Sequence, residues 1–135
     1  MASVLLTDDV PVVRMTVRRF LERGRHVVEE CGSAAEAETL LGSRPFDILV
    51  TDLWMPGRDG LTLIAWVKAH RPGLPIIAIT GGAPRAPQLF SMEEAARIGA
   101  DQVLMKPIGM QELLAAVSTL VPSDAPSDAS LDAKE

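Results

Sequence analysis

Five short apolar runs alternate with five segments whose apolar residues recur at helical spacing, and few folds accommodate this pattern. The runs predict strands at residues 4–6, 26–29, 48–50, 75–80 and 102–105. The segments between and after them predict helices near residues 11–24, 33–42, 60–72, 88–99 and 110–121. Strands that alternate with helices form parallel sheets covered on both faces. We therefore predict an α/β fold with a doubly wound, five-stranded parallel sheet.

Turn and capping residues support several of these boundaries. Pro11 is tolerated in a first helical turn, and Gly24 ends the first predicted helix. Ser33 and Glu36 have the spacing of a capping box at the start of the second helix, which Gly42 closes. The first helix is expected to gather its apolar residues on one face, namely Val12, Val13, Thr16, Val17, Phe20 and Leu21.

The length and composition fit one globular domain. The chain has 135 residues, of which 47% are hydrophobic and 23% are charged. We expect the folded domain to occupy residues 1–121. Residues 122–135 contain no core-forming residue before Leu131 and carry four acids and one lysine, so we expect a flexible acidic tail.

Charge and hydropathy argue against two classes of partner. The net charge is −5, and no cluster of lysine and arginine is long enough to follow a phosphate backbone, so direct nucleic-acid binding is not expected. No apolar run approaches the roughly 18 residues of a transmembrane helix, so we expect a cytoplasmic protein without membrane contact. A single cysteine, Cys31, excludes an internal disulfide and a cysteine-rich metal site.

Polar residues stand at the carboxyl ends of four of the five predicted strands. Asp8 and Asp9 come after the first strand, Asp52 after the third, Thr80 after the fourth and Lys106 after the fifth. In a sheet of order 2-1-3-4-5 the first and third strands are neighbours at the switch point, so the three aspartates should converge. Each residue also has an ordinary explanation, such as helix capping for the first acids, strand propensity for the threonine and solvation for the lysine.

Three carboxylates held close together repel one another unless a cation compensates them. Oxygen ligands with room for water suit Mg²⁺, which would also coordinate an oxygen of a phosphoryl group. A carboxylate such as Asp52 can be the nucleophile in phosphoryl transfer and form an acyl phosphate. Lys106 would supply a positive charge for the phosphoryl oxygens, and the Thr80 hydroxyl could donate a hydrogen bond to one of them.

From about residue 3 to residue 121, the sequence closely resembles a receiver domain of response regulators, the phosphoacceptor module of two-component systems. The resemblance implies a flavodoxin-like (βα)5 fold. It rests on matched blocks in the expected order: Asp8-Asp9, Asp52 within FDILVTDLWMPGRDG, Met55-Pro56, Asp59-Gly60, Thr80 and Lys106-Pro107.

The resemblance also implies specific roles for the matched residues. Asp52 would be the phosphorylated aspartate, and the Lys106-Pro107 peptide bond would be cis. The Mg²⁺ ion would be bound by Asp9, Asp52 and the backbone carbonyl of Trp54, and through water by Asp8. The phosphoryl donor would be a histidine kinase or a histidine phosphotransfer protein.

One position and one segment depart from the receiver pattern. Receivers usually carry Tyr or Phe three residues before the lysine, and Val103 stands there in this chain, so the usual aromatic rotamer switch is in question. The segment from Thr80 to Lys106 is also longer than is typical, with the excess in residues 81–87. We therefore predict that signalling depends mainly on this loop and the fourth helix.

Trp54 would either slow hydrolysis of the acyl phosphate or pack against the neighbouring loop.

The sequence therefore predicts a single-domain response regulator that catalyses only its own phosphorylation and dephosphorylation. Because no output domain follows Val121, we expect the output to be a separate protein. One alternative is a pseudo-receiver, a binding module that never takes phosphate. Another is a haloacid-dehalogenase-like phosphatase, but that family needs a second aspartate where Trp54 stands. A flavodoxin-like electron carrier is disfavoured, because its phosphate-binding loop, rich in Ser and Thr, would follow the first strand. This chain has Asp8-Asp9-Val10-Pro11 there, which opposes the binding of an anion.

Overall fold

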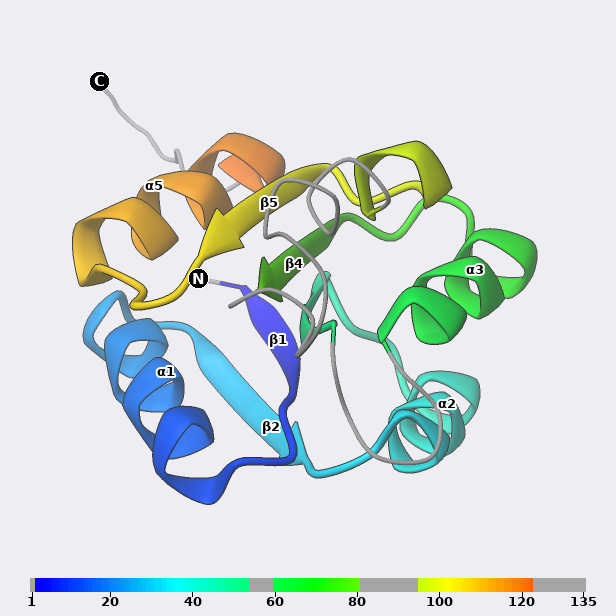
Figure 1. Ribbon diagram of the computed structural model, residues 1–135, viewed down its shortest axis with the longest axis horizontal. Helices are drawn as coiled ribbons and strands as arrows, with labels where there is room; N and C mark the ends of the chain where they lie inside the picture. Colours follow the sequence, from blue (N-terminus) through cyan, green and yellow to red (C-terminus); the bar gives the residue numbers. More distant parts are fainter. Residues whose placement is uncertain (1, 54–59, 81–94, 123–135) are drawn as a thin grey trace.

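The computed structural model describes residues 2–53, 60–80 and 95–122. Its centre is a sheet of five parallel strands in the order β2-β1-β3-β4-β5 (Figure 1). The strands are β1 Ser3–Thr7, β2 Val27–Cys31, β3 Ile48–Asp52, β4 Ile76–Thr80 and β5 Gln102–Met105. The predicted fold class and strand order are confirmed.

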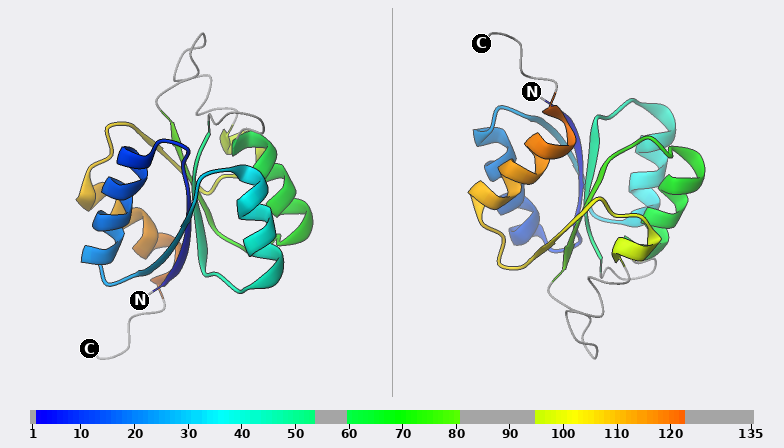
Figure 2. Two further views of the ribbon diagram at one scale, coloured as in Figure 1. Left: turned by 90° about the horizontal axis from the view of Figure 1, so that it is seen from below. Right: turned by 90° about the horizontal axis from the view of Figure 1, so that it is seen from above.

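Helices cover both faces of this sheet. They are α1 Pro11–Arg23, α2 Ala34–Ser43, α3 Gly60–His70 and α5 Met110–Leu120. Figure 2 shows α1 and α5 on one face and α2 and α3 on the other. Residues 95–98 are also helical, whereas the rest of the predicted helix at 88–99 lies largely outside the described residues. None of the described helices is both long enough and apolar enough to cross a membrane.

The sheet separates two apolar layers. Every residue of β3 and β4 is buried, as expected for central strands covered on both faces. The layer toward α2 and α3 includes Leu5, Leu49, Leu53, Leu63, Ile64, Val67 and Ile76. The layer toward α1 and α5 includes Val4, Leu6, Val17, Leu21, Val50, Ile77, Leu113 and Val117. These layers hold the strand ends in fixed relative positions.

A side-chain cap marks the start of α2 but not the start of α1. The Ser33 hydroxyl accepts a hydrogen bond from the Glu36 backbone N–H at 3.2 Å, as the capping box predicts. The Glu36 carboxylate accepts instead from the Gly32 backbone N–H at 3.0 Å, so the box is only half formed. No side chain caps α1, whose preceding residue is Val10. The interpretation of Asp8 or Asp9 as a cap for this helix is therefore wrong.

Three sequence-based boundaries or faces need correction. The second strand lies at Val27–Cys31, shifted toward the C-terminus from the predicted 26–29, and α2 extends one residue beyond Gly42. Val12 is 63% exposed, and Thr16 is also exposed. The face of α1 that contacts the sheet is narrower than predicted, because a helix that lies on a flat sheet buries only one stripe of residues.

Candidate metal centre

The carboxylates of Asp8, Asp9 and Asp52 meet at the carboxyl ends of β1 and β3. These two strands are paired in register, with Thr7 beside Thr51, so Asp8 and Asp52 leave the sheet from adjacent positions. One oxygen from each of the three acids lies within 4.8 Å of the others. The structure thus brings together three residues that are separated in the sequence but share one edge of the sheet.

Lys106 and Thr80 lie at the same edge of the sheet as the acidic cluster. The Lys106 Nζ lies 3.4 Å from Asp52 Oδ1 and 3.8 Å from Asp8 Oδ2. Thr80 is the last residue of β4 and is fully buried, and its carbonyl accepts a hydrogen bond from the Lys106 backbone N–H at 2.9 Å. The Lys106-Pro107 peptide bond is cis, as the resemblance implied. The Lys106 ammonium therefore lies beside the carboxylates, and Thr80 stands at the end of β4, the strand next to β3.

Burial makes the charge of this cluster costly. Asp52 is 4% exposed, and its burial, with the nearby charge of Asp8, raises its pKa to about 6 although Lys106 opposes the shift. Burial also raises the pKa of Asp8, against the hydrogen bond from the Val10 backbone N–H and the charge of Lys106. One lysine does not compensate these acids fully, so a further cation would be stabilised here.

Asp9 offers a carboxylate oxygen that suits such a cation. Its Oδ1 atom is buried and has no hydrogen-bond partner within the described part of the chain. Buried polar atoms are nearly always paired, so an unpaired carboxylate oxygen beside two other acids indicates a ligand. Oxygens on opposite sides of Mg²⁺ lie about 4 Å apart, so the cluster needs only slight closure or one water molecule to hold the ion. The donor set therefore fits Mg²⁺.

The backbone around Asp52 is held by contacts on several sides. Its carboxylate accepts from the Leu53 backbone N–H at 3.0 Å, and its carbonyl accepts from the Thr51 hydroxyl at 2.9 Å. Gly60 begins α3 directly against this backbone, because a Cβ built on it would lie 2.1 Å from the Asp52 carbonyl oxygen. The sequence showed Gly60 only as part of a matched block, and no local signal indicated this close approach.

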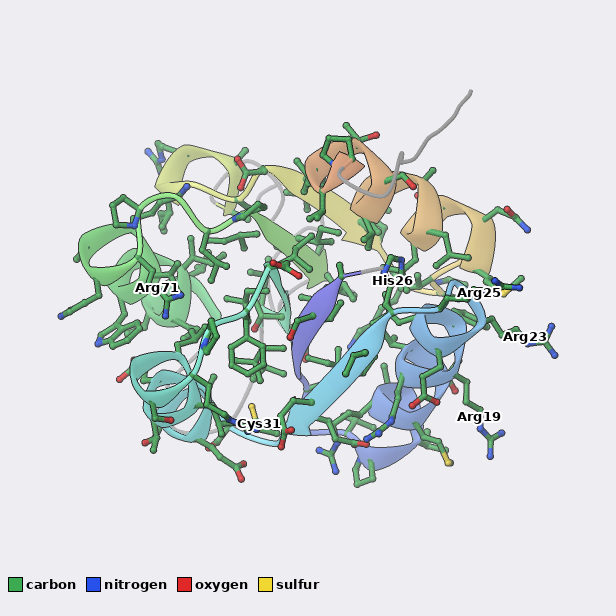
Figure 3. The ribbon with its side chains drawn as sticks, turned by 180° about the vertical axis from the view of Figure 1, so that it is seen from behind. Arg19, Arg23, Arg25, His26, Cys31 and Arg71 are labelled. Carbon is green, nitrogen blue, oxygen red and sulfur yellow. The ribbon has the colours of Figure 1, made fainter. Side chains whose placement is uncertain are left out.

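Asp8 is fixed by both neighbouring elements. Its backbone N–H donates to the Cys31 carbonyl at 3.2 Å, and its Oδ1 accepts from the Val10 backbone N–H at 2.9 Å. Its carbonyl accepts from Arg14 Nη1 at 2.7 Å. Figure 3 shows Cys31 at the end of β2, where the chain passes toward α2. No sequence pattern indicated Arg14, because only the folded arrangement brings that side chain back to Asp8.

Comparison with known protein families decides what this site belongs to. The family model of the response regulator receiver domain matches residues 4–118 of this chain. The chain belongs to the response regulator receiver domain family. Receiver domains bind Mg²⁺ at an acidic pocket, and the cluster of Asp8, Asp9 and Asp52 corresponds to such a pocket in this structure.

Curated relatives of this receiver are longer regulators. Response regulator MprA of Mycobacterium bovis is 32% identical over 126 residues, which cover 93% of this chain and 53% of the relative. Transcriptional regulatory protein GltR of Pseudomonas aeruginosa is 29% identical over 121 residues, which cover 88% of this chain and 48% of the relative. The chain thus spans about half the length of these two relatives.

Solved structures show the same receiver architecture. The chemotaxis response regulator CheY4 of Vibrio cholerae has a TM-score of 0.78 and 26% identity, with coverage of 90% of this chain and 99% of that chain. A CheY-like receiver domain protein from Methanospirillum hungatei has a TM-score of 0.77 and 26% identity, with coverage of 86% and 90%. Both neighbours support the flavodoxin-like fold of this receiver.

Of the residues that set this chain apart from the usual receiver pattern, the structure describes Val103. Val103 is partly buried and packs against the apolar layer toward α2 and α3. Trp54, including its proposed carbonyl ligand, lies outside the described residues, as do the loop at 81–87 and most of the fourth helix. The predicted route of signalling through that loop and helix therefore stays a prediction.

Proposed function

We propose that this receiver accepts a phosphoryl group onto Asp52 from the phosphohistidine of a histidine kinase or a histidine phosphotransfer protein. The observation that carries the proposal is the cluster of three carboxylates within 4.8 Å, with the Lys106 ammonium 3.4 Å from Asp52. A carboxylate oxygen of Asp52 attacks phosphorus while the phosphorus–nitrogen bond of the donor breaks. The bonding electrons return to the imidazole nitrogen, which takes a proton from solvent.

The neighbouring groups have separate roles in this transfer. Lys106 balances negative charge on the phosphoryl oxygens, and the buried Thr80 hydroxyl donates to one of them once the group is in place. Asp9, Asp52 and the Trp54 carbonyl would hold Mg²⁺, with Asp8 bound through water. The ion would neutralise the crowded acids and polarise a phosphoryl oxygen.

We assign the receiver to residues 1–121 and an acidic tail to residues 122–135. Phosphorylation would act by changing the binding of a separate protein target, without direct DNA contact by this domain. The pseudo-receiver alternative is disfavoured by the buried Asp9 oxygen, which has no hydrogen-bond partner among the described residues and which a module without a metal would leave unsatisfied there. The phosphatase alternative lacks an acid two residues after Asp52, where Trp54 stands.

Incubation with acetyl phosphate and Mg²⁺ should add the mass of one phosphoryl group to the intact protein. Asp52→Ala should remain unmodified, because the variant lacks the nucleophile. Intact-mass spectrometry checks both results, and a parallel assay with a phosphate monoester checks turnover. Equal modification of the Asp52→Ala variant would contradict the assignment of Asp52, and repeated turnover of the monoester would favour the phosphatase.

An apolar groove beside the site could seat the phosphoryl donor. It has a volume of about 480 Å³ and is lined by Val12, Val13, Thr16, Val17, Lys106, Pro107 and Ile108. Val12 is 63% exposed at this groove, although a valine is normally buried. Because Lys106 both lines the groove and reaches Asp52, a donor helix bound here would bring its phosphohistidine to the carboxylate. We propose that the donor protein docks in this groove.

Val12→Asp should slow phosphorylation by a protein donor by about tenfold or more, because it places a charge in the apolar contact. Its phosphorylation by acetyl phosphate should be unchanged, since that small donor needs no docking surface. Met15→Asp is the matched control, because Met15 is an exposed residue of α1 that does not line the groove. Rate measurements with both donors would contradict the docking proposal if Val12→Asp and Met15→Asp behaved alike.

A further inference from the structure

Arg14 of α1 connects the turn that carries the metal-site acids to strand β2. Its Nη1 donates to the Asp8 carbonyl at 2.7 Å, and its Nε donates to Glu30 Oε1 at 2.8 Å. The other carboxylate oxygen of Glu30 accepts from Arg18 Nη1, and Arg18 Nε is 2.9 Å from Glu22. The guanidinium of Arg14 is therefore held on two edges at once.

The surroundings leave this guanidinium little freedom. The side chains of Arg14 and Glu30 are only 22% and 31% exposed. A Cβ built on Gly32 would lie 3.2 Å from Arg14 Nη1, so the guanidinium also lies against the chain that leaves β2. A fixed arginine with two different acceptors acts as a brace, whereas a solvated arginine contributes little to structure.

The Asp8 carbonyl that accepts from Arg14 lies directly before Asp9 in the chain. The Asp8 carbonyl belongs to the peptide group that joins Asp8 to Asp9, so rotation of this peptide would move the Asp9 carboxylate. The Asp8 amide and carboxylate are held by Cys31 and Val10, and Arg14 holds the carbonyl. Asp9 Oδ1 has no hydrogen-bond partner in the described residues that would keep it in place. Arg14 thus contacts the peptide group that joins Asp8 to Asp9.

We propose that Arg14, fixed by Glu30, is a positioning residue that aims the Asp9 carboxylate at the metal site. The inference rests on the proposed function, because it assumes that Mg²⁺ binds at the acidic cluster. Arg14 binds neither metal nor phosphoryl group itself. Removal of a residue that orients a metal ligand without binding the metal typically weakens metal binding by about 10–100-fold.

Charge and position predict opposite effects for loss of Arg14. A cation near a cation site weakens binding of the ion, so removal of its charge alone would strengthen Mg²⁺ binding. Loss of its hydrogen bond to the Asp8 carbonyl would instead let Asp9 turn away and weaken Mg²⁺ binding. The direction of the change therefore separates the positioning role from simple electrostatics.

Calorimetric titration of the full chain with MgCl₂ tests this role directly. Arg14→Gln should weaken Mg²⁺ binding by about tenfold. Arg14→Lys should weaken it by a similar factor, because one ammonium group cannot reach the Asp8 carbonyl and Glu30 together. Arg18→Gln is the matched control, since Arg18 also binds Glu30 but does not contact Asp8. Arg19→Gln controls for charge, because Figure 3 shows Arg19 pointing outward from α1. Both controls should stay within about twofold of the unchanged protein.

A double-mutant cycle gives an independent measure of the brace. Glu30→Gln should also weaken Mg²⁺ binding, and the double variant with Arg14→Gln should be little worse than Arg14→Gln alone. Thermal unfolding of the same variants in EDTA measures their stability without metal, so that a general loss of stability can be told from a loss of Mg²⁺ affinity. The positioning role would be overturned if Arg14→Gln bound Mg²⁺ as tightly as the unchanged protein or more tightly. It would also be overturned if Arg14→Lys kept the full affinity for Mg²⁺. Neither result would contradict the proposed function. Absence of Mg²⁺ binding by the unchanged protein would overturn this inference together with the proposed function.

Discussion

Gly60→Ala is expected to lower the free energy of unfolding by at least about 2 kcal/mol and to impair phosphorylation of Asp52. The added Cβ would lie 2.1 Å from the Asp52 carbonyl oxygen and 2.7 Å from the Leu53 Cα. Both neighbours are backbone atoms, which cannot rotate away as a flexible side chain could. The start of α3 and the end of β3 must therefore separate, and Asp52 must move with the strand.

Urea denaturation and acetyl phosphate labelling measure the two effects. Gly42→Ala is the matched control, because Gly42 lies in α2 and a Cβ there meets no atom within 4 Å. The control should be as stable as the unchanged protein or more stable by up to about 1 kcal/mol, since alanine favours a helix over glycine. Equal stability of Gly60→Ala and Gly42→Ala would show that α3 does not press on the Asp52 backbone.

Asp52→Asn should stabilise the metal-free protein near neutral pH, although it removes the phosphoacceptor. The pKa of Asp52 is raised from 3.8 to about 6, so the folded state binds this proton more tightly than the unfolded state. The carboxyl group therefore costs no stability below about pH 4, and its cost grows as the pH rises toward 6. Above that pH the cost approaches about 3 kcal/mol, at about 1.4 kcal/mol per pKa unit.

Denaturation in EDTA across pH 4–8 tests this expectation. The stability advantage of Asp52→Asn should be largest above pH 6 and should vanish toward pH 4. Mg²⁺ should stabilise the unchanged protein at pH 7 and have less effect on the variant, because the ion binds the folded carboxylates. An advantage of the same size at all pH values would show that it does not arise from ionisation of Asp52.

The fold and the convergence of the acids could be predicted because both depend on patterns that the sequence displays. The apolar runs marked the strands closely enough that β5 matches its predicted range of 102–105. Asp52 and Lys106 stand at strand ends, and the sheet order alone brings those ends together. The predicted meeting of Asp8, Asp9 and Asp52 follows from the same order.

The features that the sequence did not reveal depend on how each helix lies on the sheet. Val12 has the spacing of an inner-face residue, yet the rotation of α1 leaves it exposed beside Pro107. Arg14 reaches back to the Asp8 carbonyl only because α1 packs beside the turn that precedes it. Position 60 requires a glycine because α3 begins so close to the end of β3. The periodicity of apolar residues in the sequence carries no information about that distance.

Locating the phosphoryl group tests the central claim most directly. The protein would be treated with acetyl phosphate with or without Mg²⁺, reduced with borohydride and digested, so that an aspartyl phosphate is converted to homoserine. Tandem mass spectrometry should find homoserine at position 52 only in the sample with Mg²⁺. Homoserine at another aspartate, or equal labelling of Asp52 in EDTA, would contradict the claim that a metal-bound cluster makes Asp52 the phosphoacceptor.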